Sequence, residues 1–263
     1  MELHTFLGQA RRCLLSSVAR RRARLINSHP LISFTFDDFP KSALATGGAI
    51  LKHTGVSGTY YTAGGLMGTT TELGPMFDQA DLEILLEAGH ELGSHTFSHV
   101  SARRMPLSGY YKEVLKGQQE LARYGKGTVG LNFSYPFGHV TIRAKRRLSN
   151  MAPSCRSIHP GLNGPTVDLN LLRSNSLYGG VERLSFAQAL IDENARQRTW
   201  LIFYTHDVQQ HPSAYGCTPD FFEKVVRFAA DSDAQIVTVA HALNQISPSE
   251  DGMFAAQFRP RSG

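Results

Sequence analysis

The chain has 263 residues, of which 41% are hydrophobic and 19% are charged, so it can bury a full core, and we interpret it as one large domain. No apolar run of 18 residues occurs, which argues against a membrane-spanning helix. The formal charge of +5 comes largely from one N-terminal stretch, so the rest of the chain needs no polyanion to explain its charge and nucleic-acid binding is not expected.

The first 30 residues combine apolar side chains at steps of three and four with several arginines. This spacing predicts a basic amphipathic helix over residues 1–30. We expect it to pack on the domain, and peripheral contact with a membrane surface is the alternative. Its short apolar segment is bracketed by arginines, which is untypical of a secretory signal, whereas an organellar transit peptide stays open. The apolar positions are Leu3, Phe6, Leu7, Ala10, Leu14 and Val18.

After residue 30, short β-favouring runs alternate with longer helical patterns. The β-favouring runs cover residues 31–36, 57–64, 90–97, 130–138, 154–158, 171–178, 199–208 and 235–243, and helical patterns cover 78–90, 110–125, 186–198 and 219–233. Because parallel neighbours need a crossover connection, this alternation predicts an α/β fold. We expect a distorted (β/α) barrel with seven or eight mostly parallel strands over residues 31–250, and a mobile tail over residues 251–263.

Three cysteines, Cys13, Cys155 and Cys217, lie far apart and form no CxxC pair. Their number and spacing indicate neither a disulfide framework nor a thiolate zinc site. A reducing compartment fits this pattern, so we expect a cytoplasmic protein.

Polar side chains follow several of the expected strands. In a (β/α) barrel the carboxyl ends of the strands share one face, where active sites form. We therefore expect these residues to gather around one mouth: Asp37, Asp38, His95, His99, Tyr135, His206 and Asp207.

The spacing of His95 and His99 puts two imidazoles on one face of a helical turn, as in two-histidine metal sites. Together with one carboxylate they would make a three-ligand zinc site with a free position. A cation would make the neighbouring charges of Asp37 and Asp38 tolerable, with one acid bound to metal and the other free to accept a proton. Capping of the following helix by one of the two acids is the alternative. His206 ends an apolar strand, where it is either a general acid or a core histidine.

The segments "FTFDD", "HTFSH", "YPFG" and "YTHD", in this order, resemble the motifs of the NodB-type polysaccharide deacetylases, carbohydrate esterase family 4. The resemblance extends from about Leu31 to about Ile246. It implies a distorted (β/α) barrel and metal-dependent hydrolysis of N-acetyl groups on an amino sugar.

Carried over by position, the resemblance assigns Asp37 as catalytic base, His206 as catalytic acid and the Tyr135 backbone N–H as oxyanion donor. The metal ligands it implies are Asp38, His95 and His99. The expected ion is zinc, with cobalt or nickel as alternatives.

Two supporting groups of that family have no obvious counterpart. Ser134 stands where an arginine often orients the base, and Arg173 is the candidate that supplies this charge from another strand. Asp168 and Asp207 are candidates to support His206, whereas Trp200 is expected in the core.

The expected substrate is an N-acetylated saccharide or glycan precursor, and a cytoplasmic location favours a biosynthetic intermediate. A hydrolase of cyclic amides or imides, or a non-catalytic carbohydrate-binding relative, is the alternative; a binder has no need for both an acid and a base. The glycine-rich loop over residues 64–78 is expected to form part of the substrate cleft. Aromatic residues placed for a sugar cleft are Tyr60, Tyr61, Phe97, Tyr135 and Phe137, of which strand alternation sends about half into the core.

Overall fold

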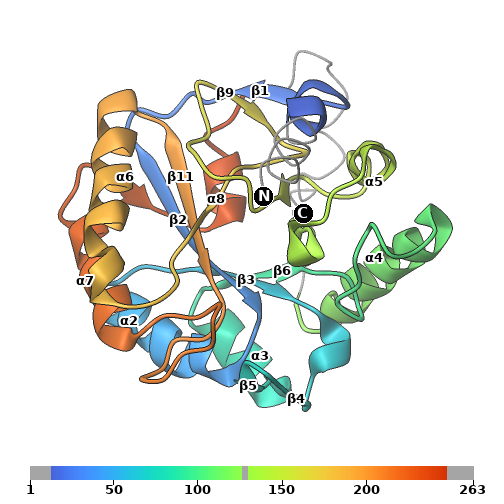
Figure 1. Ribbon diagram of the computed structural model, residues 1–263, viewed down its shortest axis with the longest axis horizontal. Coiled ribbons are helices and arrows are strands. Elements are labelled where there is room, and N and C mark those ends of the chain that lie inside the picture. Colours follow the sequence, from blue (N-terminus) through green and yellow to red (C-terminus); the bar gives the residue numbers. More distant parts are fainter. Residues whose placement is uncertain (1–12, 126–129, 248–263) are drawn as a thin grey trace, which may run out of the picture.

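The computed structural model describes residues 13–125 and 130–247. Its main sheet has eight strands, seven of them in the order β10-β11-β2-β3-β6-β7-β8, with β12 beside β2. All of the pairings in this sheet are parallel, and the sheet curls into a half-barrel, which confirms the predicted fold class (Figure 1). The strands are β2 Leu31–Asp38, β3 Thr59–Thr62, β6 Glu91–Ser94, β7 Phe133–Ser134, β8 Cys155–Arg156, β10 Asn175–Ser176, β11 Trp200–Thr205 and β12 Gln235–Ile236.

The central strand β2 has one apolar and one polar row because successive side chains of a strand point to opposite faces. Phe34 and Phe36 belong to the apolar row and pack against Phe222, with ring centroids 5.6 Å apart in both pairs. The alternate positions carry Ser33, Thr35 and Asp37, all buried. The polar row therefore lies inside the half-barrel, where chemistry can be placed.

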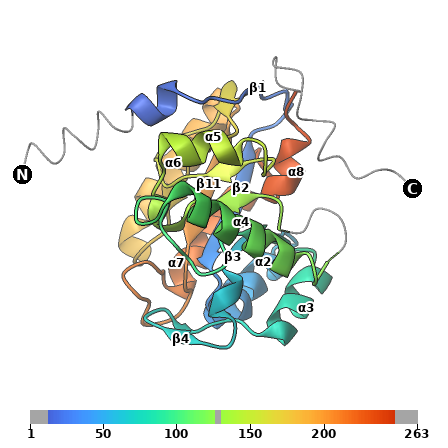
Figure 2. The ribbon, with the colours of Figure 1, turned by 90° about the vertical axis from the view of Figure 1, so that its right-hand side faces the viewer.

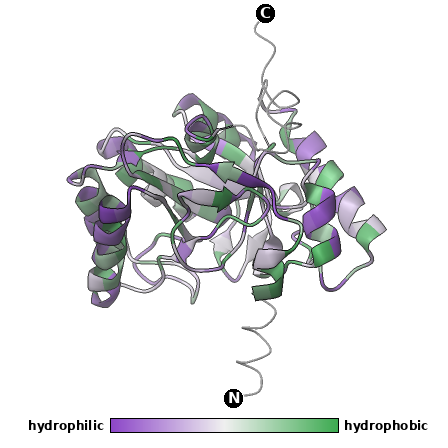
Figure 3. Ribbon diagram, turned by 90° about the horizontal axis from the view of Figure 1, so that it is seen from above, coloured by the Kyte–Doolittle hydropathy of each residue, from purple (hydrophilic) through white to green (hydrophobic). Residues whose placement is uncertain are grey.

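Helices cover the outer face of the sheet. They are α2 Ala49–His53, α3 Gln79–Glu87, α4 Leu107–Leu121, α5 Ile142–Leu148, α6 Leu184–Gln197, α7 Pro219–Ala230 and α8 Val239–Leu243. Short helical turns occur at Ala43–Gly48, Gly64–Leu66, Pro136–Gly138 and Val181–Arg183. Figure 3 shows both hydrophilic and hydrophobic residues along these helices, as expected for elements with one buried face.

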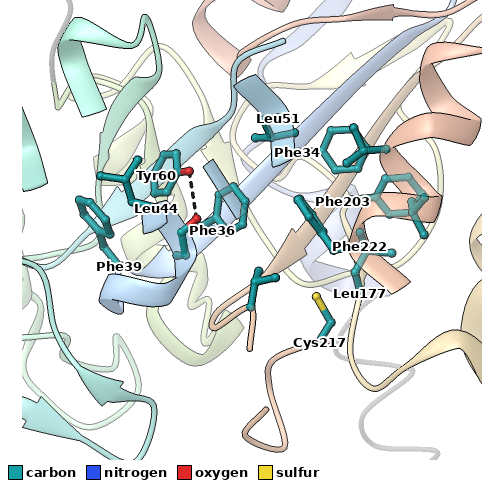
Figure 4. Packing of buried hydrophobic residues seen from close by; sticks show 14 of the residues in the cluster. Phe34, Phe36, Phe39, Leu44, Leu51, Tyr60, Leu177, Phe203, Cys217 and Phe222 are labelled. Carbon is teal, nitrogen blue, oxygen red and sulfur yellow. Dashed lines mark hydrogen bonds between the residues drawn. The ribbon is translucent and has the colours of Figure 1, made fainter. Parts of the chain in front are cut away.

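The largest hydrophobic cluster lies between the sheet and helices α2, α3, α6 and α7. Stacked rings fill it: the ring centroids of Phe36 and Tyr60 lie 4.5 Å apart (Figure 4). Those of Phe39 and Phe77 lie 5.0 Å apart. The Tyr60 hydroxyl donates to the Ala43 carbonyl. This packing fixes the carboxyl end of β2, where the two acids lie.

Two small antiparallel pairs lie at opposite ends of the domain. Strand β1 (Arg22–Arg24) pairs with β9 (Thr166–Asp168), and β4 (Thr70–Thr71) pairs with β5 (Gly74–Pro75). Figures 1 and 2 place β1 at one end and β4 at the other. The β4–β5 hairpin is part of the loop after β3.

The predicted helix over residues 1–30 is wrong for its C-terminal half. Residues 13–17 are helical, but β1 follows, because pairing with β9 satisfies its backbone. Lys145 holds this segment by donating to the Leu15 and Val18 carbonyls and to Asp168. Residues 1–12 and the predicted tail over residues 251–263 lie outside the described residues.

The last predicted strand, 235–243, is also shorter than expected. Within this range only β12, Gln235–Ile236, is a strand, and α8 begins at Val239. The Thr238 hydroxyl caps this helix by accepting a hydrogen bond from the His241 N–H. Within the described residues, no helix has the length and apolar character needed to cross a membrane.

Candidate active site

The carboxyl end of β2 departs from regular strand geometry at the acid pair. Asp38 and Phe39 have φ angles of 65° and 67°, in the left-handed region that non-glycine residues rarely adopt. The Phe39 N–H donates to the Asp37 carbonyl at 2.7 Å. A regular strand would send adjacent side chains to opposite faces, so this turn allows both carboxylates to line one pocket.

Three potential metal ligands converge beside this turn. His95 directly follows β6, and His99 lies four residues further on. The segment between them is not the helical turn that the spacing predicted, because Thr96 and His99 have φ angles of 61° and 49°. The Nε2 atoms of the two histidines lie 3.5 Å and 3.1 Å from Asp38 Oδ1. The ligand atoms of the three residues all lie within 4.8 Å of one another. His95 Nδ1 donates to the Ser134 carbonyl at 2.8 Å, because a carbonyl can only accept. His95 Nε2 therefore presents a lone pair to the site.

The donor set fits a divalent cation. Asp38 Oδ1 is buried and accepts no hydrogen bond, which leaves its lone pairs facing the two imidazoles. Ligands of a tetrahedral ion bound at about 2.0–2.1 Å lie about 3.3 Å from one another, close to the separations of 3.1 and 3.5 Å. Burial raises the pKa of Asp38 to about 7 and lowers that of His95 to about 3. Burial also lowers the pKa of His99, so both imidazoles are neutral, as metal ligation requires.

Asp37 forms a buried ion pair with Arg156 of β8. Arg156 Nη2 donates to both oxygens of the Asp37 carboxylate and, at 2.6 Å, to the Ser134 hydroxyl. Burial alone would raise the pKa of Asp37, but Arg156, with help from His95 and His206, holds it below its usual value. Asp37 is therefore ionised at neutral pH and able to accept a proton.

Arg156 is the orienting charge that the sequence prediction placed at Arg173. Arg173 is exposed, and its Nη1 donates to the Pro160 carbonyl, so that prediction is wrong. Arg156 lies directly opposite Ser134 in the β7–β8 register, which lets it reach the same carboxylate as an arginine on β7 would. The sequence contains a signal for this role. Arg156 lies in the middle of the expected strand 154–158, and a charge buried in a strand needs a partner of opposite charge.

His206 follows β11 and lines the same pocket. Its Nδ1 lies 3.1 Å from the Tyr215 carbonyl, and its Nε2 lies 4.0 Å from Asp38 Oδ2. A backbone carbonyl, and not a carboxylate, therefore orients the ring. The carbonyl belongs to the loop over residues 207–217.

The two carboxylates predicted to support His206 have other partners. Asp207 is fully buried and accepts from the Ser213 N–H and hydroxyl, so it shapes the loop that carries the Tyr215 carbonyl. Asp168 forms its ion pair with Lys145 at 2.6 Å. Trp200 is buried and donates to the Ser33 hydroxyl, as the core prediction required.

The predicted oxyanion role of Tyr135 is wrong. Its side chain is 1% exposed, and its backbone N–H already donates to the Arg156 carbonyl in the β7–β8 ladder. The next aromatic of the motif, Phe137, lines the pocket with a φ of 59° and its ring centroid 4.4 Å from that of His99.

Positive φ angles concentrate at this site. Seven non-glycine residues in the described part of the chain have positive φ. Four of them lie in the motif segments and Phe39 directly follows the first motif; the four are Asp38, Thr96, His99 and Phe137. Such strained backbone persists where surrounding structure enforces it, often at functional sites.

The pocket has a volume of about 280 Å³. Loop 64–78 contributes Glu72 and Leu73 to its wall, as predicted for that loop, and the aromatic lining comes mainly from residues that the sequence analysis missed. Of the aromatics proposed for a sugar cleft, only Phe137 lines it; Tyr60, Tyr61 and Tyr135 are buried. The other lining aromatics are Tyr178, Tyr204 and Tyr215.

Known proteins share this fold. Residues 26–152 match the family model for polysaccharide deacetylase. A family 4 acetyl xylan esterase from Clostridium thermocellum, solved with a cobalt ion, is 18% identical, with a TM-score of 0.57 over 81% of this chain and 90% of that one. The Bc1960 peptidoglycan N-acetylglucosamine deacetylase is 14% identical, with a TM-score of 0.55 over 86% and 93%.

Peptidoglycan deacetylase PdaC from Bacillus subtilis is 16% identical, with a TM-score of 0.51 over 83% of this chain and 92% of that one. No curated protein sequence matches the chain. Residues 26–152 thus carry the polysaccharide deacetylase family match, and the fold shared with these solved structures extends over most of the chain. Its Asp38, His95 and His99 form the set of ligands expected for a divalent metal ion.

Proposed function

We propose that this protein is a metal-dependent hydrolase that removes N-acetyl groups from an amino sugar. The observation that carries the proposal is the convergence, in one pocket, of a three-ligand cation site with an ionised carboxylate and a histidine outside the ligand set. A binding protein would have no need for this combination of acid, base and metal.

When bound, a divalent ion supplies Lewis acidity for the acetyl carbonyl and for water. Asp37 takes a proton from the attacking water, since Arg156 keeps its carboxylate ionised and oriented. His206 donates a proton to the departing amine, and its bond to the Tyr215 carbonyl sets the ring orientation. The Ser134 carbonyl fixes the tautomer of His95, so that its Nε2 is free to bind the ion.

We propose zinc as the ion, because two neutral imidazoles and one carboxylate with an open position are a common catalytic zinc set. The substrate class follows from the family: an acetylated saccharide, and by this proposal one that carries an N-acetyl group. A cytoplasmic location stays a prediction from the cysteine pattern, and fractionation of cells that express the native protein would test it.

The test is acetate release from N-acetylglucosamine oligomers by the zinc-loaded full chain, with and without chelator, and by Asp37→Asn. We expect release that chelator abolishes and that zinc restores, and a loss of at least about 100-fold in Asp37→Asn. Asp192→Asn, an exposed acid of α6, is the matched control and should keep full activity.

Bound zinc without acetate release from any acetylated sugar would reject the proposed substrate class. Turnover of a cyclic amide or imide would then favour the small-molecule alternative. Retention of activity in Asp37→Asn would reject its role as base.

A further inference from the structure

Residues at or after the strand ends of the half-barrel line the pocket. Asp37 and Tyr204 come from β2 and β11, His95 follows β6, and Phe137 follows β7. The remaining wall comes from Leu73 after β3, with Ile158 and Tyr178 after β8 and β10. Every strand from β10 to β8 in the sheet order therefore contributes.

The open side of a half-barrel lies between its outer strands, here β8 and β10, and the chain itself fills this gap. The Ser157 N–H donates to the Leu172 carbonyl at 2.8 Å, and the Ser174 N–H donates to the His159 carbonyl at 2.9 Å. Ile158, between these two contacts, lines the pocket. Backbone hydrogen bonds therefore bridge the gap between β8 and β10 next to the pocket.

The β4–β5 hairpin and the loop over residues 207–217 add to the wall, through Glu72, Leu73 and Tyr215. The hairpin base is tied to the acid-pair segment by the Phe77 N–H, which donates to the Phe39 carbonyl at 3.1 Å. The loop is tied to the same segment by the Val208 N–H, which donates to the Ser42 hydroxyl at 3.3 Å. The hairpin and the loop are therefore both anchored to the segment that follows Asp37 and Asp38.

We propose that this pocket is a blind well that takes only a terminal N-acetylated sugar, either a chain end or a short saccharide, and excludes interior residues of a polymer. An interior residue needs a groove with two exits, whereas this pocket is lined from every strand end of the half-barrel and also by the β4–β5 hairpin and the loop over residues 207–217. The volume of about 280 Å³ lies near the lower end of ligand pockets, about 300–1,000 Å³, which suits a single sugar unit. This inference rests on the proposed deacetylase function.

The test uses an N-acetylglucosamine pentamer labelled with ¹⁸O at its reducing end and the zinc-loaded full chain. Tandem mass spectrometry locates each free amine, and acetate release gives the rate. We expect free amines at one terminal unit, at least tenfold more often than at interior units. Interior deacetylation at comparable frequency overturns the inference and leaves the deacetylase function intact, whereas no release from any acetylated sugar overturns the function and the inference with it.

Variants with a shortened pocket wall provide a second test of the proposal. Replacement of residues 70–75 by two glycines should raise the interior share at least tenfold, with zinc content as the check that the site still folds. Tyr215→Ala removes a half-exposed wall side chain while keeping its carbonyl, and should move the pattern in the same direction. Phe186→Ala, a similarly exposed aromatic of α6, should leave it unchanged. Terminal-only products from a trimmed variant that keeps its zinc would show that the wall does not set the pattern.

Discussion

Replacing Arg156 by methionine removes the partner of the buried Asp37 charge without leaving a large void. Arg156 is fully buried, and its guanidinium carbon lies 5.1 Å and 4.9 Å from the ring centroids of Tyr61 and Tyr204. Asp37, only 4% exposed, would lose the cation that holds its pKa down, so burial would leave it either as an uncompensated charge or protonated. Breaking one side of a buried ion pair costs about 3–5 kcal/mol, a large part of the ~5–15 kcal/mol of a typical domain.

The same change should lower activity because the base loses its orienting contact. A displacement of about 1 Å at a catalytic group costs about 100-fold in rate, so we expect kcat to fall by at least that factor. Bound metal should stay near one ion per chain, because Arg156 contacts none of the three ligand side chains through a hydrogen bond. Loss of activity with retained metal separates positioning of the base from collapse of the site.

Urea unfolding followed by the fluorescence of Trp200, the single tryptophan of the chain, measures the stability change. Arg173→Met is the control, and we expect a change within about 0.5 kcal/mol because Arg173 is exposed. The exchange Ser134→Arg with Arg156→Ser should recover part of the loss, since the two positions are paired neighbours. A loss below about 1 kcal/mol for Arg156→Met, or an equal loss for Arg173→Met, would refute the reasoning.

Three further changes test the ligand set, the His206 loop and a buried histidine. His99→Ala should lower metal affinity by at least about tenfold and reduce acetate release in parallel, because one of three protein ligands is lost; metal titration measures it. Gly216→Ala should lower kcat by about tenfold or more with bound metal unchanged, because its Cβ would lie 2.3 Å from Asp207 Oδ1 and displace the neighbouring carbonyl that orients His206. Burial lowers the pKa of His90 to about 4 from 6.5, so the unfolded state binds more protons between these values. Its contribution to stability is therefore present above pH 6.5 and lost as pH falls toward 4, by up to about 3 kcal/mol, and His90→Gln should show a correspondingly smaller loss in urea unfolding.

Each of these expectations has a contrary outcome. Unchanged metal affinity in His99→Ala would remove His99 from the ligand set, with His241→Ala, an exposed histidine of α8, as the control. Full activity in Gly216→Ala would mean that the loop does not orient the acid. Parallel pH profiles for wild type and His90→Gln would assign the acid sensitivity to other groups.

Local sequence was sufficient for the parts of the site that lie on consecutive residues. The acid pair follows an apolar strand, and the two histidines lie four residues apart after another, so parallel topology brings the segments that carry Asp38, His95 and His99 to the same end of the sheet. Alternation of strand and helix likewise determined the fold class. The roles assigned to Asp37 and His206 stay predictions that the geometry supports.

Tertiary structure decided the contacts between residues far apart in the chain. Arg156 replaced Arg173 as the partner of Asp37 because strand register, which composition does not encode, sets Arg156 opposite Ser134. Tyr135 proved to be a core residue because its N–H is used in the β7–β8 ladder. The Tyr215 carbonyl orients His206 through a loop held by Asp207. Motif spacing along the chain thus determined the metal ligands, whereas packing and pairing between strands determined which groups orient the base and the acid and how the pocket is closed.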